Sequence, residues 1–224
     1  MNKHEKLIAN LSTSLAPVSP APNINRLALS WFLLSAIYTV AVTQLFGPIR
    51  PGAFSQLASE PRFLLETMLG VAAILWTALL ALRSAVPAAL SKQFAATGMV
   101  LMTLWLAQYV IGFISPALEP SSLGKRTYCY VETLAYALPV ILAGLYFVRR
   151  LYPLRPVRTA MSIGLVAGML PALYMQLACM YEPLHILAFH ILPGLLMVGV
   201  GAIIAARWHV NKKGSGSFNR GAIK

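Results

Sequence analysis

Residues 63–82 read FLLETMLGVAAILWTALLAL, and this stretch decides the class of fold. Glu66 is its only charged residue. An α-helix needs about 20 consecutive, mostly apolar residues to cross the ~30 Å hydrocarbon layer of a bilayer. A soluble domain of this size has too little interior to bury such helices, which are apolar on every side. The stretch is therefore predicted to be a transmembrane helix.

Five further stretches have the same character. They are Leu27–Phe46, Ala95–Ser115, Tyr128–Val148, Thr159–Met180 and His185–Ala206. Hydrophobic residues make up 58% of the 224 residues and charged residues only 11%, which excludes a soluble globular protein. We therefore predict an all-α, polytopic membrane protein. Residues 27–206 would form a domain of six transmembrane helices, between an N-terminal segment, 1–26, and a tail, 207–224.

The distribution of Lys and Arg predicts the orientation, because short cytoplasmic loops of membrane proteins are rich in both. With both termini in the cytoplasm, 14 of the 18 basic residues lie on the cytoplasmic side. The four on the outer side are Arg50, Arg62, Lys125 and Arg126. The net charge of +12 is then mostly a signal of topology. Direct nucleic-acid binding is not expected, since it needs a basic surface on a folded soluble face.

The pattern Cys-x-x-Glu occurs twice, at Cys129–Glu132 and at Cys179–Glu182, and contains the only two cysteines of the chain. In the predicted orientation both copies lie at the non-cytoplasmic ends of spans. Residues three apart share one face of a helix, so each thiol is expected beside its carboxylate. Two thiols and two carboxylates would then meet on the outer side, where oxidants or metal ions arrive. We interpret this arrangement as a sensing site.

Two histidines follow the second copy of the pattern. Pro183 disfavours helix at the residue before it, so the fifth span is expected to end at Glu182. The tight turn would hold His185 within reach of Cys179. His190 lies five residues further on, about 140° round an α-helix, so the two histidines are expected to be poor joint ligands of one ion. A packing role for His190 is equally open.

Three interpretations of the cysteines are open. Buried cysteines are commonly inert packing residues. A disulfide could form in an oxidising compartment if the two Cα atoms lie within ~7 Å. In the third interpretation, Cys129, Cys179, His185 and His190 bind a soft or borderline metal ion such as zinc, copper or cadmium. The glutamates would serve as further ligands or as bases acting through water. The sequence does not separate disulfide from metal, so no cofactor is assigned.

A short amphipathic helix is predicted near the N-terminus. Leu7, Ile8, Leu11 and Leu15 line one face of it, and Pro17 prevents its continuation. This face lies either on the anionic lipid of the inner leaflet or on a cytoplasmic protein. We adopt the second alternative as a hypothesis, which makes the four residues candidate partner-binding residues.

The order of the motifs along the chain resembles the negative regulator of sigma F family. The matching motifs are Leu15-Ala16-Pro17-Val18, Phe63-Leu64-Leu65-Glu66, Cys129-x-x-Glu132, Cys179-x-x-Glu182, His190, Gly199-x-Gly201 and Arg207-Trp208. The resemblance implies a six-span protein of the bacterial inner membrane that holds an extracytoplasmic-function sigma factor inactive. It also implies that Cys129 and Cys179 receive a stress signal. We therefore expect an anti-sigma factor and not an enzyme, with membrane lipid as a second partner and homo-oligomers as an open question.

Two other classes of function are open. A transporter for small solutes or metal ions would need polar residues along the middle of the membrane, whereas here acids and histidines gather at one face. A thiol oxidoreductase that passes electrons to quinone normally needs four thiols, and this chain has two. A sensor needs only an outer site and two arrangements of the helices. A sensor requires fewer sequence features than the other two classes and is the preferred hypothesis.

Overall fold

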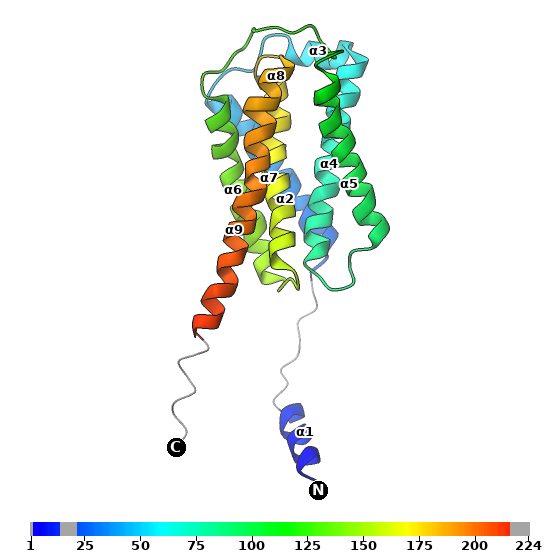
Figure 1. The fold of residues 1–224 in the computed structure, drawn as a ribbon, viewed down its shortest axis with the longest axis vertical. Coiled ribbons are helices and arrows are strands. Elements are labelled where there is room, and N and C mark those ends of the chain that lie inside the picture. Colours follow the sequence, from blue (N-terminus) through cyan, green and yellow to red (C-terminus); the bar gives the residue numbers. More distant parts are fainter. Residues whose placement is uncertain (1, 14–21, 216–224) are drawn as a thin grey trace.

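The protein is a bundle of long helices (Figure 1). The computed structural model describes residues 2–13 and 22–215, with side chains as far as Trp208. Six helices in this part are long and apolar enough to cross a membrane. They are α2 (Ile24–Leu45), α4 (Pro61–Ser84), α5 (Lys92–Ile111), α6 (Cys129–Arg150), α7 (Pro156–Ala178) and a composite last span, Pro183–Trp208. No described residue belongs to a β-strand, so the prediction of an all-α fold with six spans is confirmed.

The last span is composite, and two short helices of the described chain lie outside the spans. The last span is built from α8 (Pro183–Ile186), the π-helix η1 (Leu187–Ile191) and α9 (Leu192–Ser215). Helix α1 (Lys3–Thr13) precedes the bundle in sequence, and α3 (Ala53–Ser59) connects α2 to α4. The sequence analysis did not predict α3. Its seven residues are too few for a periodic pattern, and Gly52 at its N-cap has a φ of 77°.

Local sequence signals explain several helix ends. The Asn23 side chain accepts a hydrogen bond from the Arg26 N–H (3.1 Å), and the Ser91 hydroxyl accepts one from Phe94 (3.2 Å). Both are N-caps that satisfy a free N–H of the first turn. Pro61 and Pro156 occupy the first helical positions of α4 and α7, where the missing N–H costs nothing.

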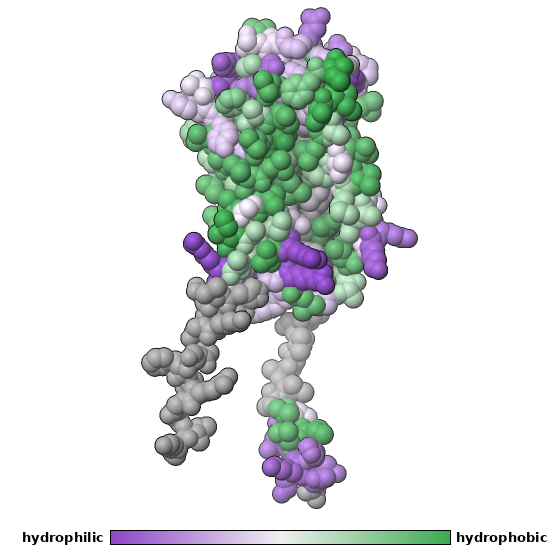
Figure 2. Space-filling model, viewed as in Figure 1, coloured by the Kyte–Doolittle hydropathy of each residue, from purple (hydrophilic) through white to green (hydrophobic). Residues whose placement is uncertain are grey.

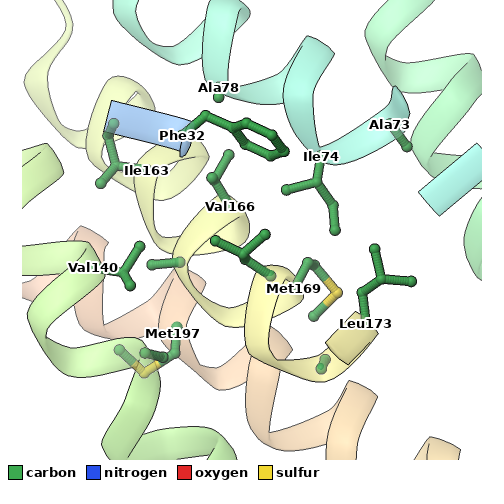
Figure 3. Packing of buried hydrophobic residues seen from close by; sticks show 14 of the residues in the cluster. Phe32, Ala73, Ile74, Ala78, Val140, Ile163, Val166, Met169, Leu173 and Met197 are labelled. Carbon is green, nitrogen blue, oxygen red and sulfur yellow. The ribbon is translucent and has the colours of Figure 1, made fainter. Parts of the chain in front are cut away.

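Helix α7 lies at the centre of the bundle. Sixteen of its 23 residues are buried, against four of the 20 in α5. Figure 3 shows side chains of α7 packed between those of its neighbours. They are Ile163, Val166, Met169 and Leu173, against Phe32 of α2, Ala73, Ile74 and Ala78 of α4, Val140 of α6 and Met197 of α9. The helix that ends at the second cysteine is thus fixed from several sides.

Helices α7 and α9 approach each other through glycine. The pattern Gly164-x-x-x-Gly168 is typical of close helix pairs, because small residues let two main chains come together. A Cβ atom on Gly168 would overlap the carbonyl oxygen of Gly194, and one on Gly164 would overlap that of Met197. Gly201 faces the Ala160 carbonyl in the same way. This contact sets the position of η1, which directly precedes α9, relative to the end of α7.

The surface view in Figure 2 shows a hydrophobic belt over the bundle between two more hydrophilic ends. Helices α3 and α8 lie at one end (Figure 1). The start of α2 and the end of α9 lie at the opposite end (Figure 1). The two cysteines belong to the α8 end, since Cys179 follows α7 and Pro183 opens α8.

The predicted orientation can be tested by labelling single cysteines in a variant that carries Cys129→Ser and Cys179→Ser. A membrane-impermeant maleimide should label Ser122→Cys in intact cells and Ser215→Cys only after permeabilisation, because the Lys/Arg distribution places Ser122 outside. Labelling of both positions from the same side would rule out six spans with both termini in the cytoplasm.

Candidate functional site

The two cysteines lie side by side. Cys129 opens α6 and Cys179 directly follows α7. Their sulfur atoms are 3.0 Å apart, and both residues are buried free thiols. Helices α6 and α7 run antiparallel across a short turn, which brings the start of one to the end of the other. Sulfurs this close need only a small movement to reach the ~2.05 Å of a disulfide bond.

Both histidines join the thiols. The Nε2 atom of His185 lies 3.4 Å from the sulfur of Cys179. The rings of His185 and His190 are 5.1 Å apart between centroids. His190 is completely buried, and neither of its ring nitrogens has a hydrogen-bond partner among the described residues. Buried polar groups are almost always paired, so the nitrogens of His190 are candidates to bind a ligand at this site.

The π-helix η1 explains why the histidines meet. A π-helix has i→i+5 hydrogen bonds, so residues five apart lie over one another. The expectation that His185 and His190 point about 140° apart was wrong, because it assumed α-helical pitch through residues 187–191. Single π turns inside α-helices are frequent at functional sites.

The cluster can hold a metal ion. One ligand atom from each of Cys129, Cys179, His185 and His190 lies within 4.8 Å of all the others. Two thiolates and two imidazoles form the closed, four-coordinate ligand set of structural zinc sites. The unpartnered nitrogens of His190 fit this chemistry, since one of them would become a ligand. The same geometry also permits a disulfide, in which the histidines take no part.

The surroundings of Cys179 make its thiol easier to ionise. The contact between the sulfurs of Cys129 and Cys179 lowers the pKa of Cys179, burial opposes this effect, and His185 lowers the pKa further. A thiolate is the form that attacks oxidants and binds metals.

Glu132 binds an arginine and not a thiol. The Arg126 guanidinium donates to both of its carboxylate oxygens, at 2.8 and 3.3 Å. Arg126 also donates to the carbonyls of Pro48 (3.2 Å) and Thr43 (3.3 Å), at the end of α2. Burial lowers the pKa of Arg126, but Glu132 outweighs burial and the pKa is raised, so the ion pair stays charged. The carbonyl of Arg126 accepts a hydrogen bond from Cys129 (3.2 Å).

Glu182 caps α8. Its carboxylate accepts hydrogen bonds from the N–H groups of Leu184 (3.2 Å) and His185 (2.5 Å). The expectation that Cys179 and Glu182 share a helix face was wrong, because α7 ends at Ala178 and Cys179 is extended. An isolated antiparallel bridge between Ser121 and Tyr181 draws the chain out of the helix there. Glu182 therefore orients the turn that carries His185.

Sequence reasoning missed two residues at this site. Arg126 connects Cys129 to α2, as described above. Arg50 is buried, and its main-chain N–H donates to the carbonyl of Ala178, next to Cys179 (3.0 Å). Both belong to the four basic residues that the predicted topology places outside. The small number of basic residues predicted on the outer side was the only signal in the sequence that could have indicated these two.

The candidate partner-binding residues are on α1. Leu7, Ile8 and Leu11 have exposed side chains, between 57% and 65% accessible. Leu15 lies outside the described residues. An exposed apolar face on a short helix is compatible with both earlier alternatives, lipid and protein.

Comparison with known proteins identifies the family. The sequence model described as negative regulator of sigma F matches residues 11–209. No curated protein matches the chain, and no solved structure does. The family match runs from the N-terminal helix through all six spans and both cysteines. This chain belongs to the negative regulator of sigma F family.

Proposed function

We propose that this protein is an anti-sigma factor of the bacterial inner membrane. It binds an extracytoplasmic-function sigma factor on the cytoplasmic side and releases it when the outer cysteine site is oxidised or binds a soft or borderline metal ion. Membership of the family supports negative regulation of a sigma factor. The observation that carries the sensing step is the group of Cys129, Cys179, His185 and His190 at the end of the bundle opposite the start of α2.

Either chemical event removes the thiol protons. Oxidation forms the bond between the sulfurs of Cys129 and Cys179, and two electrons and two protons pass to the oxidant. Metal binding displaces the two thiol protons, since the ligands are thiolates. In both cases Cys129 stops donating a hydrogen bond to the carbonyl of Arg126. The loss of this bond is the first structural change that either signal would cause.

Two connections lead from the site to the cytoplasmic end. Arg126 binds the carbonyls of Thr43 and Pro48 at the end of α2, and the other end of α2 continues towards the N-terminal segment. Helices α6 and α7 contain Pro139 and Pro171 and meet in the arginine-rich turn between them. A change in either connection would alter the cytoplasmic contact. Allosteric coupling between two sites typically amounts to about 1–3 kcal/mol, a change in affinity of ~5–150-fold.

The proposal is tested by affinity purification of the tagged chain from native membranes. A sigma factor should co-elute from untreated membranes, and its yield should fall after brief exposure to diamide or to zinc or cadmium ions. A membrane protein tagged in the same way serves as the control for non-specific capture. Absence of any sigma factor, or an unchanged yield after every challenge, would contradict the proposal.

The double substitution Leu7→Asp and Leu11→Asp should release the sigma factor without any challenge. Burial of each leucine against the partner contributes about 1.5–3 kcal/mol, so the loss of both should weaken binding by ~100-fold or more. Ala9→Asp with Thr13→Asp is the matched control, because it adds two charges at the same spacing on the opposite face of α1. Equal co-purification with both double variants would assign the leucines to the lipid surface.

A further inference from the structure

An arginine without an ion-pair partner is buried beside the site. Arg50 is only 4% exposed. Its Nε and Nη2 atoms are buried and have no hydrogen-bond partner among the described residues. Burial lowers the pKa of this guanidinium, which means that its charge is not fully offset by its surroundings.

Three contacts hold Arg50 next to the cysteines. Its main-chain N–H donates to Ala178, the residue before Cys179. The preceding residue, Ile49, packs against the cluster of Cys129 and Cys179. The Cζ atom of Arg50 lies 5.9 Å from the centroid of the Tyr181 ring, two residues after Cys179. The main chain is therefore tied to the end of α7, and the guanidinium lies over the strand-like turn that follows it.

The outer loop closes over the Arg50 side chain. Gly124 has a φ of 76°, and a Cβ atom there would lie 2.8 Å from the Cβ of Arg50. A residue with a side chain would thus be strained in its main chain and would press on Arg50. Water is kept from most of the guanidinium, so the charge needs a partner within the protein.

The other basic residues at this end of the bundle either form an ion pair or are exposed to solvent. Arg62 pairs with Glu66 at 2.9 Å and Arg126 pairs with Glu132 at 2.8 Å. Lys125 is exposed to solvent. Among the outer basic residues, Arg50 is thus the one that is buried without a carboxylate within ion-pair distance in the described structure. Burial lowers the pKa of Arg50, and the negative charges that oppose this effect are those of Tyr181 and of Cys179, one of the two thiols that would bind a metal.

We propose that Arg50 is a positioning residue of the metal-bound site, the counter-charge that stabilises the thiolates of Cys129 and Cys179 around the ion. The inference rests on the metal branch of the proposed function. A metal ion with two thiolates and two neutral imidazoles places negative charge on the sulfurs, whereas a disulfide carries none. Arg50 thus has its largest electrostatic role in the metal-bound form, in which both sulfurs are charged. Partners beyond the direct ligands commonly change metal affinity by ~10–100-fold.

The test is a metal titration of the purified, reduced full chain in detergent. Cobalt(II) reports binding through its thiolate absorption bands, and zinc(II) affinity follows from competition with a chromophoric chelator. Wild type is compared with Arg50→Met, Arg50→Gln, Arg50→Lys and the exposed control Lys125→Gln. The methionine variant keeps an apolar stem of similar length, so it guards against loss of folding. Each variant is first checked as a monodisperse peak in gel filtration.

Zinc affinity should fall ~10–100-fold in the two neutral variants and stay close to wild type in Arg50→Lys and Lys125→Gln. The cobalt bands at saturation should keep their positions, because the ligands are unchanged. Wild-type affinity in a folded neutral variant would overturn the role of Arg50 and leave the proposed function standing. Equal losses in Arg50→Lys and Arg50→Met would also overturn it, in favour of packing. If wild type binds no zinc through its cysteines, both this role and the metal branch fail.

Discussion

Gly168→Ile should prevent the bundle from packing. The new side chain would meet the carbonyl oxygen of Gly194, a main-chain atom of α9 that cannot move without the whole helix. Overpacking of a tight contact costs about 1–3 kcal/mol and sometimes more, and we expect the upper end because the obstacle is main chain. The variant should run as aggregate in gel filtration or show a strongly reduced Tm in detergent.

Gly199→Ile is the matched control. Gly199 lies on the same helix pair, is exposed, and has no atom within 4 Å of the added Cβ. The same substitution should therefore leave the elution profile and the Tm near those of wild type. Equal behaviour of the two variants would show that close packing of α7 on α9 does not hold the bundle together.

Cys129→Ser and Cys179→Ser should each abolish release of the sigma factor. Serine keeps the size of the side chain but forms neither a disulfide nor a strong bond to a soft metal ion. The ~5–150-fold change in affinity that a challenge is expected to cause should disappear. Co-purification before and after diamide or zinc measures it. The proposed sensing mechanism is wrong if both serine variants still release the sigma factor.

His185→Gln and His190→Gln separate the two kinds of signal. In the metal interpretation each variant loses one of the four ligands of the ion, so release by zinc should be weakened while release by diamide persists. In a purely disulfide mechanism release by diamide should persist in both variants, and zinc should cause no release even from wild type, because Zn²⁺ is not an oxidant. Both variants keep the two thiols, and gel filtration shows whether each variant is folded.

The sequence predicted the spans well because membrane helices follow from length and hydrophobicity alone. The predicted Phe63–Leu82 lies inside α4, Pro61–Ser84, and the prediction for the fourth span differs from α6 by at most two residues at each end. The third and fifth spans were drawn four and two residues too long, to Ser115 and Met180. Both errors arose because the residues after these helices are still apolar. Hydrophobicity alone does not show where a helix ends among apolar residues.

The sequence predicted that the two cysteines are close, but it did not predict the contacts around them. Cys129 and Cys179 were expected to be close because both end antiparallel neighbouring spans, and they are. The contacts of Glu132 and Glu182 were not predictable, because they depend on Arg126 in a distant loop and on a cap that forms only after α7 has ended. Arg50 lies about 130 residues before Cys179 in the sequence, and only the folded chain shows that they meet.

The π turn at Leu187–Ile191 also affects how sequences of this family are compared. A π turn is an α turn with one additional residue, so histidines five apart here are presented as histidines four apart would be on an ordinary α-helix. A relative with one residue fewer in this segment could therefore present the same two imidazoles. A one-residue gap in an alignment of this segment would indicate a change in helical pitch. Both aligned sequences could still present the pair of histidines.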